Sequence, residues 1–299
     1  MIKNFKSLYE CLQNKKPLRL GVVGANDPEV MHAINEAVHL GLIIPELIVW
    51  SKEGRLASSG LLVREAAEPL AAAKLGVQLV QDGELDLLMK GQITSVDFLR
   101  PVVAKEKGLV STRGILSHVA LFELPGREGL TFLSDAAVMI EPDLEQKILM
   151  IENGLKVVRA LGYDPPRVAI LSALEKVNSK IPSSVMAGKL AELGSIGRFG
   201  NALVSGPLAL DNALDLDAAV AKGIGHDPVA GRADFLIVPE LVSGNILYKS
   251  FTVVSGYPGA GVVTGAKIPL ILTSRADSHQ VKLNSIAVAC YLKQGIWKE

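Results

Sequence analysis

Residues 18–50, LRLGVVGANDPEVMHAINEAVHLGLIIPELIVW, contain an apolar run, a turn, a helical pattern and a second apolar run. The first run, Leu18–Val23, predicts a short buried β-strand. Asp27 and Pro28 are typical of an N-cap and a first helical position, and apolar residues at helical spacing follow them. This order of strand, turn, helix and strand predicts a β/α unit with parallel strands.

The rest of the chain continues the alternation of apolar runs and helical patterns. Two extended segments, 114–124 and 129–140, are separated by the turn sequence Pro125-Gly126-Arg127-Glu128, and strands joined so tightly are expected to be antiparallel. Elsewhere strands alternate with helices, which predicts an α/β fold with mostly parallel sheets. The pattern predicts strands at 42–50, 85–89, 167–172, 202–204, 234–238, 262–263 and 268–272, and helices at 63–75, 95–107, 143–161 and 278–292.

The composition limits the classes of protein to which the chain can belong. The 299 residues include 31 Lys and Arg against 31 Asp and Glu, and 49% are hydrophobic, which excludes a disordered chain. Without a basic block, nucleic acid is not expected as a partner. The longest uncharged stretch, 250–266, is too short and too rich in glycine for a membrane span, which needs about 20 apolar residues. Only Cys11 and Cys290 are present, and the N-terminus lacks an apolar signal segment, so we expect a cytoplasmic protein.

One polar cluster stands where a ligand of an α/β sheet would bind. Residues 273–278, TSRADS, directly follow the apolar run 268–272 and precede the last predicted helix. Arg275 offers a planar fork of donors that matches phosphate, and hydroxyls and a helix N-terminus add further donors. The alternative is that Asp277 or Ser278 is an ordinary N-cap and Arg275 forms a surface ion pair.

Further candidates also follow predicted strands, and each has an ordinary structural alternative. A glycine after a strand lets a backbone approach a ligand, but it is equally common in turns. A carboxylate there acts as a base or, more often, caps a helix. An arginine on a helix is more often on a solvated face than in a site. These candidates are Lys90 and Gly91, Arg100, and the stretch with Ser205, Gly206 and Asp211.

No metal site is predicted. His32 and His39 are seven residues apart on one predicted helix, whereas chelation by two side chains of a helix needs a spacing of three or four. The sequence also lacks a Gly-x-Ser-x-Gly elbow and a P-loop, so it gives no motif for serine hydrolysis or nucleoside triphosphate chemistry.

Six stretches together resemble the phosphate acetyl/butyryltransferase family, and within it the phosphate butyryltransferase branch. The resemblance covers nearly the whole chain. The stretches are MKGQITSVDFLRP (89–101), PGREGLTFLSDAAVMIEPDLEQK (125–147), VAILSALEKVNSKIP (168–182), SGPLALDNA (205–213), GRADFLIVPELVSGNILYK (231–249) and TGAKIPLILTSRADS (264–278).

This resemblance implies a short-chain acyl-CoA:phosphate acyltransferase, which converts acyl-CoA, butyryl-CoA or similar, and inorganic phosphate to acyl phosphate and CoA. It also implies a two-domain, three-layer α/β fold similar to the isocitrate/isopropylmalate dehydrogenase-like architecture, with the active-site cleft between the domains. We expect residues 1–135 plus 270–299 to form the first domain and 136–269 the second. The resemblance further implies a homodimer or larger homo-oligomer, with CoA as substrate and no tightly bound cofactor.

The same resemblance suggests roles for individual residues. Ser274 and Arg275 match the family's serine–arginine pair at the active site, and Arg100 matches the arginine of its Leu-Arg-Pro motif at the substrate cleft. In the acetyl branch the pair is followed by glycine and a later aspartate, whereas Ala276 and Asp277 follow here. Asp277 is therefore a candidate for the general base, and Asp211 is its rival. We expect CoA phosphates to contact rim cations such as Lys90 or Lys249.

Three other functions remain as alternatives. Acetyl-CoA is one alternative substrate, since a methylene is worth only about 1–3 kcal/mol of discrimination. An NAD-dependent oxidoreductase of related fold is the second, although the sequence shows no aspartate cluster for the accompanying metal. A non-catalytic relative that binds CoA is the third, and the presence of Ser274, Arg275 and Arg100 argues against it.

Overall fold

The computed structural model describes residues 1–50, 61–112 and 114–295, and it divides into two compact units. The terminal unit comprises Asn4–Leu116 and Pro258–Glu299, and the middle unit comprises Ser117–Tyr257 with Met1–Lys3. Both boundaries lie earlier in the chain than the predicted ones after residues 135 and 269. β5 (Ser117–Phe122) pairs with β6 (Thr131–Ser134) in the middle unit, and β10 (Gly259–Thr264) pairs with β11 (Leu270–Leu272) in the terminal unit.

The terminal unit contains a sheet with the strand order β3-β2-β1-β4-β11-β10. Its strands are parallel except for β10, which runs antiparallel to β11. The elements of this unit are α1 (Phe5–Leu12), β1 (Leu18–Val23), α2 (Pro28–His39), β2 (Ile43–Trp50), β3 (Leu62–Ala66), α3 (Pro69–Gln81), β4 (Leu87–Lys90), α4 (Ser95–Val102), β10 (Gly259–Thr264), β11 (Leu270–Leu272) and α10 (His279–Gly295).

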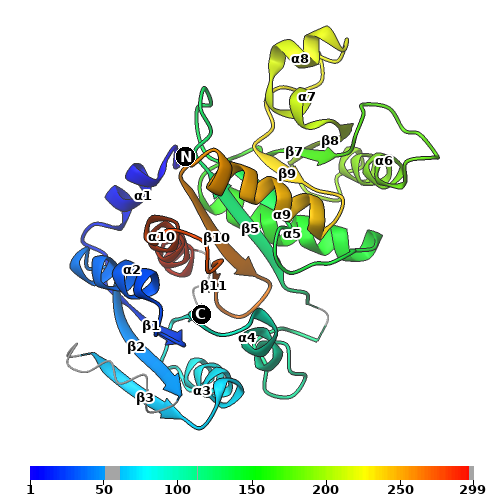
Figure 1. Ribbon diagram of the computed structural model, residues 1–299. Helices are drawn as coiled ribbons and strands as arrows, with labels where there is room; N and C mark the ends of the chain where they lie inside the picture. The colour runs from blue at the N-terminus through cyan, green and yellow to red at the C-terminus, as the bar shows by residue number, and fades with distance from the viewer. Residues whose placement is uncertain (51–60, 113, 296–299) are drawn as a thin grey trace. The chain divides into compact units, whose positions relative to one another are not determined.

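Helices cover both faces of this sheet. α2 and α10 pack together on one face, while α3 and α4 pack together on the other (Figure 1). The start of α2 forms as predicted, because the Asp27 carboxylate accepts hydrogen bonds from the N–H groups of Glu29 and Val30, and Pro28 occupies the first turn. The cap directs the chain from the end of β1 into α2.

The predicted helix over residues 63–75 is wrong. Leu62–Ala66 is the edge strand β3, which pairs in parallel with β2, and the helix α3 begins only at Pro69. On β3 the Arg64 guanidinium forms ion pairs with Glu46 and Glu84. Pairing to a neighbouring strand decided the conformation of this short segment, because β-propensity depends strongly on context.

The strands of the middle unit follow the order β5-β6-β9-β7-β8. The β5–β6 pair is antiparallel, as predicted for the two extended segments, and the other pairs are parallel. The elements are β5 (Ser117–Phe122), β6 (Thr131–Ser134), α5 (Leu144–Ala160), β7 (Arg167–Leu171), α6 (Pro182–Ser195), β8 (Leu203–Leu208), α7 (Leu210–Leu214), α8 (Leu216–Ala221), β9 (Phe235–Ile237), α9 (Leu241–Lys249) and the π-helix η2 (Ser250–Val254).

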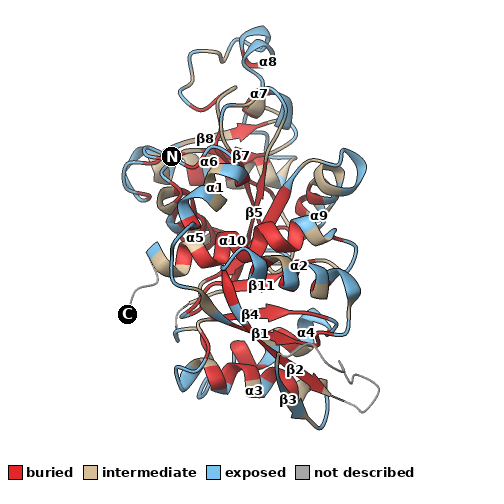
Figure 2. Ribbon diagram, turned by 90° about the vertical axis from the view of Figure 1, so that its left-hand side faces the viewer, coloured by how far each residue is buried: buried red, intermediate tan, exposed pale blue. Residues whose placement is uncertain are grey.

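The core of each unit is built on its central strands. Six strands, β4, β5, β6, β9, β10 and β11, are buried along their whole length. In Figure 2, β4 and β5 are coloured red as buried strands. Strands buried on both faces are typical of parallel sheets covered by helices, so the predicted α/β class is confirmed. Among the helices of the described residues, none has the length and hydropathy needed to cross a membrane.

Candidate active site

Three parallel strands of the terminal unit, β1, β4 and β11, end next to one another at one edge of the sheet. The register pairs Lys90, the last residue of β4, with Val23 of β1 and with Leu272 of β11. Lys90 therefore lies between two strand ends, beside the loop that follows Leu272. Ligands of open α/β sheets bind at this carboxyl edge.

The loop after β11 is a tight turn held by its own hydrogen bonds. The Asp277 carboxylate accepts a hydrogen bond of 2.7 Å from the Ser274 N–H, and the Asp277 N–H donates to the Ser274 carbonyl at 3.2 Å. The Ser274 hydroxyl accepts from the Ala276 N–H at 3.3 Å. The Lys282 ammonium donates to the Asp277 carbonyl. Asp277 is buried and Arg275 is exposed, so the turn presents the Arg275 guanidinium from a braced backbone.

Lys90 is buried at the centre of this edge. Its ammonium donates to the carbonyl oxygens of Gly91 at 3.2 Å and Ile93 at 3.3 Å. An ammonium has three N–H donors. With two of them directed to the backbone, the third is left for a ligand.

Three cations act on one another at this edge. Burial lowers the pKa of Lys90, and the positive charges of Arg275 and Lys282 lower it further. The carboxylates of Asp277 and Asp27 act in the opposite direction without restoring the ordinary pKa. The cations outnumber these carboxylates, so a bound anion would relieve their repulsion. The arrangement suits phosphate, which arginine binds through a planar fork and lysine as a point charge.

Gly91 is required by the close approach of two backbone segments. A Cβ atom at this position would lie 2.1 Å from the Gly24 carbonyl oxygen and 3.0 Å from that of Val23. The Gly91 N–H also donates to the Val23 carbonyl at 2.9 Å. Gly91 thus fixes the end of β4, and with it Lys90, against the end of β1.

We expect Gly91→Ala to lower the free energy of unfolding by about 2–4 kcal/mol, because the atoms that must give way are backbone atoms. Chemical denaturation measures this loss. Gly295→Ala is the matched control, since a Cβ at Gly295 meets no atom within 4 Å. A loss for Gly91→Ala no larger than that of the control would contradict the packing role.

Arg100 belongs to another part of the terminal unit. It lines a cavity of about 380 Å³ between α3 and α4, together with Lys74, Lys107, two glutamines and apolar side chains. Among the described residues, this lining includes neither Lys90 nor Arg275. Arg100 stands in the last turn of α4. Because a helix rises about 1.5 Å per residue, this turn is displaced along the helix from the start of α4, which follows the end of β4. The structure therefore gives the terminal unit two separate cationic positions.

The remaining candidates lie in the middle unit, where each has a structural contact. The Ser205 hydroxyl donates to the Asp227 carboxylate, at 2.8 Å from both oxygens. A Cβ at Gly206 would lie 2.8 Å from the Cβ of Ile170, so glycine permits the packing of β8 on β7. Asp211 is exposed and accepts a hydrogen bond of 2.8 Å from the N–H of Asn212. These contacts give each of the three residues a structural role that does not require a bound ligand.

A smaller cavity of about 230 Å³ in the middle unit contains a cation that sequence reasoning missed. Lys147 lines it and donates to the carbonyls of Val238 at 3.0 Å and Pro239 at 2.7 Å. Burial lowers the pKa of Lys147 to about 8, against the opposing charges of Glu240 and Asp135. Lys147 is thus a buried cation at the end of β9.

Lys282 was also missed, although the sequence carries a signal for it. It is the single lysine in the stretch QVKLNSIAVAC (280–290) of α10, and it is 1% exposed. Lys282 is the single charged residue of this stretch, and a lysine is almost never fully buried without partners. Its partner here is the carbonyl of Asp277.

Comparison with known sequences identifies relatives along nearly the whole chain. The phosphate acetyl/butaryl transferase family matches residues 51–290. A phosphate butyryltransferase from Clostridium acetobutylicum is 37% identical over 97% of this chain and 98% of its own length. A phosphate acetyltransferase from Rhizobium meliloti is 41% identical over 85% of this chain and 82% of its own length.

Solved structures agree with these sequence matches. The branched-chain phosphotransacylase of Enterococcus faecalis V583 superposes with a TM-score of 0.84 at 32% identity, covering 93% of this chain and 99% of that one. A putative 4-hydroxythreonine-4-phosphate dehydrogenase from Salmonella typhimurium, at 11% identity and a TM-score of 0.53, shares the fold, which confirms the predicted dehydrogenase-like architecture. The chain belongs to the phosphate acetyl/butaryl transferase family.

Proposed function

We propose that this protein transfers a short acyl group reversibly between coenzyme A and inorganic phosphate. Membership of the family supports this activity, and relatives named for butyryl and acetyl transfer both match at more than 35% identity. The observation that carries the proposal is the cluster of Lys90, Arg275 and Lys282 at the carboxyl edge of the terminal unit's sheet. A phosphate dianion would compensate these charges.

In the proposed reaction a phosphate oxygen attacks the thioester carbonyl carbon, the carbon–sulfur bond breaks, and CoA leaves as a thiolate that takes up a proton. Arg275 orients the phosphate through two parallel N–H···O bonds. Holding its oxygen about 3 Å from the carbonyl carbon is worth several kcal/mol. The Ser274 hydroxyl accepts from the Ala276 N–H, so its own O–H is available to the developing oxyanion or to the thiolate.

We propose Asp277 as the group that takes the proton from phosphate. The Asp277 carboxylate lies in the same turn as Arg275 and accepts a hydrogen bond from the Ser274 N–H, so it is held beside the proposed phosphate site. Asp277 also braces the loop that carries Arg275, so its removal affects position as well as proton transfer. Asp211 is the rival base. Its side chain is 55% exposed, and one of its carboxylate oxygens lies 3.7 Å from the Lys222 ammonium nitrogen.

The substrate panel that tests the proposal consists of acetyl-, butyryl- and isobutyryl-CoA, each with inorganic phosphate. We expect thiol release that depends on phosphate, is matched by acyl phosphate, and is fastest with butyryl-CoA. Release from none of the three substrates, or release without phosphate, would contradict the proposal. A cytoplasmic location, a homo-oligomeric assembly and the lack of a tightly bound cofactor stay predictions.

We also propose that the cavity of Arg100, Lys74 and Lys107 holds a phosphate group of CoA. Arg100→Ala is then expected to raise KM for acyl-CoA about tenfold with little change in kcat, because an interaction remote from the reacting atoms is equal in ground and transition states. Steady-state kinetics measures both constants. Lys105→Ala, an exposed lysine outside the lining, is the control. A fall in kcat with unchanged KM would contradict this assignment.

A further inference from the structure

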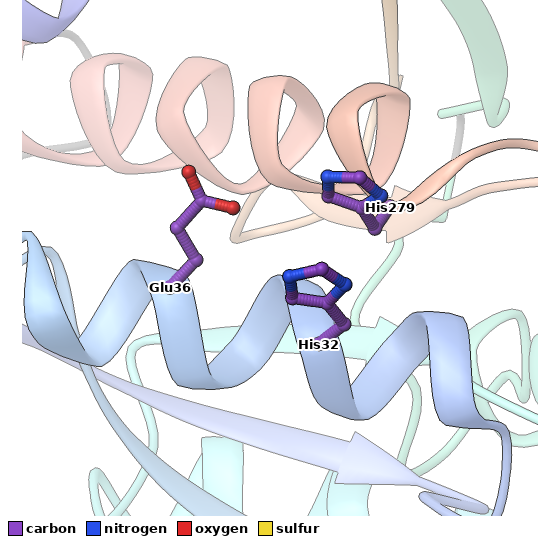
Figure 3. Close-up of side chains that lie close together, drawn as sticks. All are labelled: His32, Glu36 and His279. Atoms are coloured by element: carbon purple, nitrogen blue, oxygen red, sulfur yellow. The ribbon is translucent and has the colours of Figure 1, made fainter.

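Two helices of the terminal unit bring together two imidazoles and a carboxylate. His32 and Glu36 lie on α2, and His279 is the first residue of α10. One ligand atom from each of the three side chains lies within 4.8 Å of the others. Figure 3 shows the Glu36 carboxylate and one nitrogen of each imidazole facing the space between the two helices.

The fold produces this cluster in two steps. His32 and Glu36 are four residues apart, so they share one face of α2. α10 packs on α2 and places the His279 ring over that of His32, with ring centres 4.1 Å apart and planes inclined by 13°. Because 247 residues separate the two histidines, only the packing of α10 reveals the cluster.

The ligand atoms of this cluster are available. Among the described residues, the His32 imidazole and the Glu36 carboxylate have neither a hydrogen bond nor an ion pair. The Nδ1 atom of His279 lies 3.6 Å from an oxygen of Glu29, and that carboxylate also accepts from the His279 N–H at 2.9 Å. A histidine that ligates a metal commonly turns its other nitrogen toward a carboxylate, which fixes the ring. Glu29 is placed for this role and leaves Nε2 of His279 for a ligand.

We propose that His32, Glu36 and His279 bind one divalent transition-metal ion of the Zn²⁺ class and so link α2 to α10. Two imidazoles and one carboxylate are a ligand set that suits zinc, and they leave a position for water. Mg²⁺ and Ca²⁺ prefer oxygen ligands and are not expected here. Zinc bonds of about 2 Å bring ligand atoms to roughly 3.3 Å from one another at tetrahedral angles, so the ligand atoms must close by up to about 1.5 Å. The two stacked imidazoles must also turn so that a lone pair of each ring points to one ion, and the exposure of His32 leaves room for this.

The position gives the metal a structural rather than a catalytic role. α10 begins directly after the loop of Ser274, Arg275 and Asp277, and α2 begins directly after Asp27. A metal that links the first turn of α10 to the middle of α2 would restrain both helices that follow the segments bordering the anion site. The proposed zinc site does not depend on the proposed acyl transfer. It differs from the expectation of no metal site, because that expectation considered only the spacing of histidines within one helix.

To test this proposal, metal is first removed from the full chain with EDTA, and the EDTA is removed by dialysis. ZnCl2 is then titrated into the protein, and binding is measured by isothermal titration calorimetry. We expect one Zn²⁺ per chain and a rise in the thermal unfolding midpoint when zinc is present. His32→Ala and Glu36→Gln are each expected to weaken binding at least tenfold and to abolish the rise. Circular dichroism verifies that both variants are folded.

Two controls separate this site from other zinc-binding groups of the chain. His39→Ala removes an exposed histidine of the same helix, and Cys11→Ser removes the exposed thiol. Both are expected to bind zinc as the native chain does. No binding by the native chain, equal binding by His32→Ala, or an equal loss in His39→Ala would overturn the proposal.

Discussion

Replacement of Arg275 by alanine is expected to lower kcat/KM for phosphate-dependent CoA release by about 10²–10⁴, while the unfolding transition stays nearly unchanged. The guanidinium is exposed, so its removal leaves no cavity and no buried partner unpaired. The variant loses the guanidinium that orients the phosphate and neutralises its charge during the attack. Groups of this kind stabilise a transition state by several kcal/mol. Initial rates over a grid of phosphate and acyl-CoA concentrations measure the effect.

Two further variants make this result specific. Arg275→Lys keeps the charge but loses the bidentate geometry, so it should recover only part of the activity. Arg198→Ala removes another exposed guanidinium, which pairs with Glu152 in the middle unit, and should leave the rate unchanged. Native kinetics in Arg275→Ala would show that the phosphate site lies elsewhere, even if the protein is an acyltransferase.

Replacement of Lys90 by methionine is expected to lower the rate about 10²-fold at neutral pH, mainly through a higher KM for phosphate. In the native chain the pKa of Lys90 is lowered, first by burial and then by Arg275 and Lys282. As the pH rises through this lowered pKa, the ammonium loses its charge before an ordinary lysine does, at about 10.4. Phosphate affinity should therefore fall with rising pH in the native chain, and the methionine variant should lack this alkaline limb.

The lowered pKa of Lys90 also makes the stability of the fold depend on pH. This stability changes with pH in the direction opposite to the phosphate affinity. Below the lowered pKa both folded and unfolded chains carry the proton, and the folded state bears the full penalty of the buried charge. Between that pKa and about 10.4 the unfolded chain binds more protons, so Lys90's contribution to stability rises with pH.

Lys90→Arg, which stays charged, should keep phosphate binding at alkaline pH. A native KM and pH profile in Lys90→Met would contradict the role of Lys90.

Much of the fold was predictable because local and tertiary preferences agree. Asp27 and Pro28 start α2 as their chemistry requires, and the turn at Pro125-Gly126 joins an antiparallel pair. The predicted helix at 63–75 fails because Leu62–Ala66 gains hydrogen bonds only by pairing with β2, a neighbour that local spacing does not reveal.

The candidate site was predictable where its residues are adjacent in sequence. The loop with Ser274, Arg275 and Asp277 follows a strand, and that order is compatible with an anion site as well as with an ordinary N-cap and a surface ion pair. Lys282 was missed because its part in the site depends on a helix turning its side chain back to the Asp277 carbonyl. Arg100 was assigned to substrate binding through the family resemblance, and the structure places it on the cavity between α3 and α4.

A crystal structure of the protein grown with CoA and inorganic phosphate shows whether Arg275 holds the attacking phosphate. We expect a phosphate ion within hydrogen-bond distance of the Arg275 guanidinium, with the Lys90 ammonium and the Ser274 hydroxyl directed at the ion or at the CoA sulfur. A phosphate ion bound near the CoA sulfur on other residues, with the Arg275 side chain extended into solvent, would contradict it.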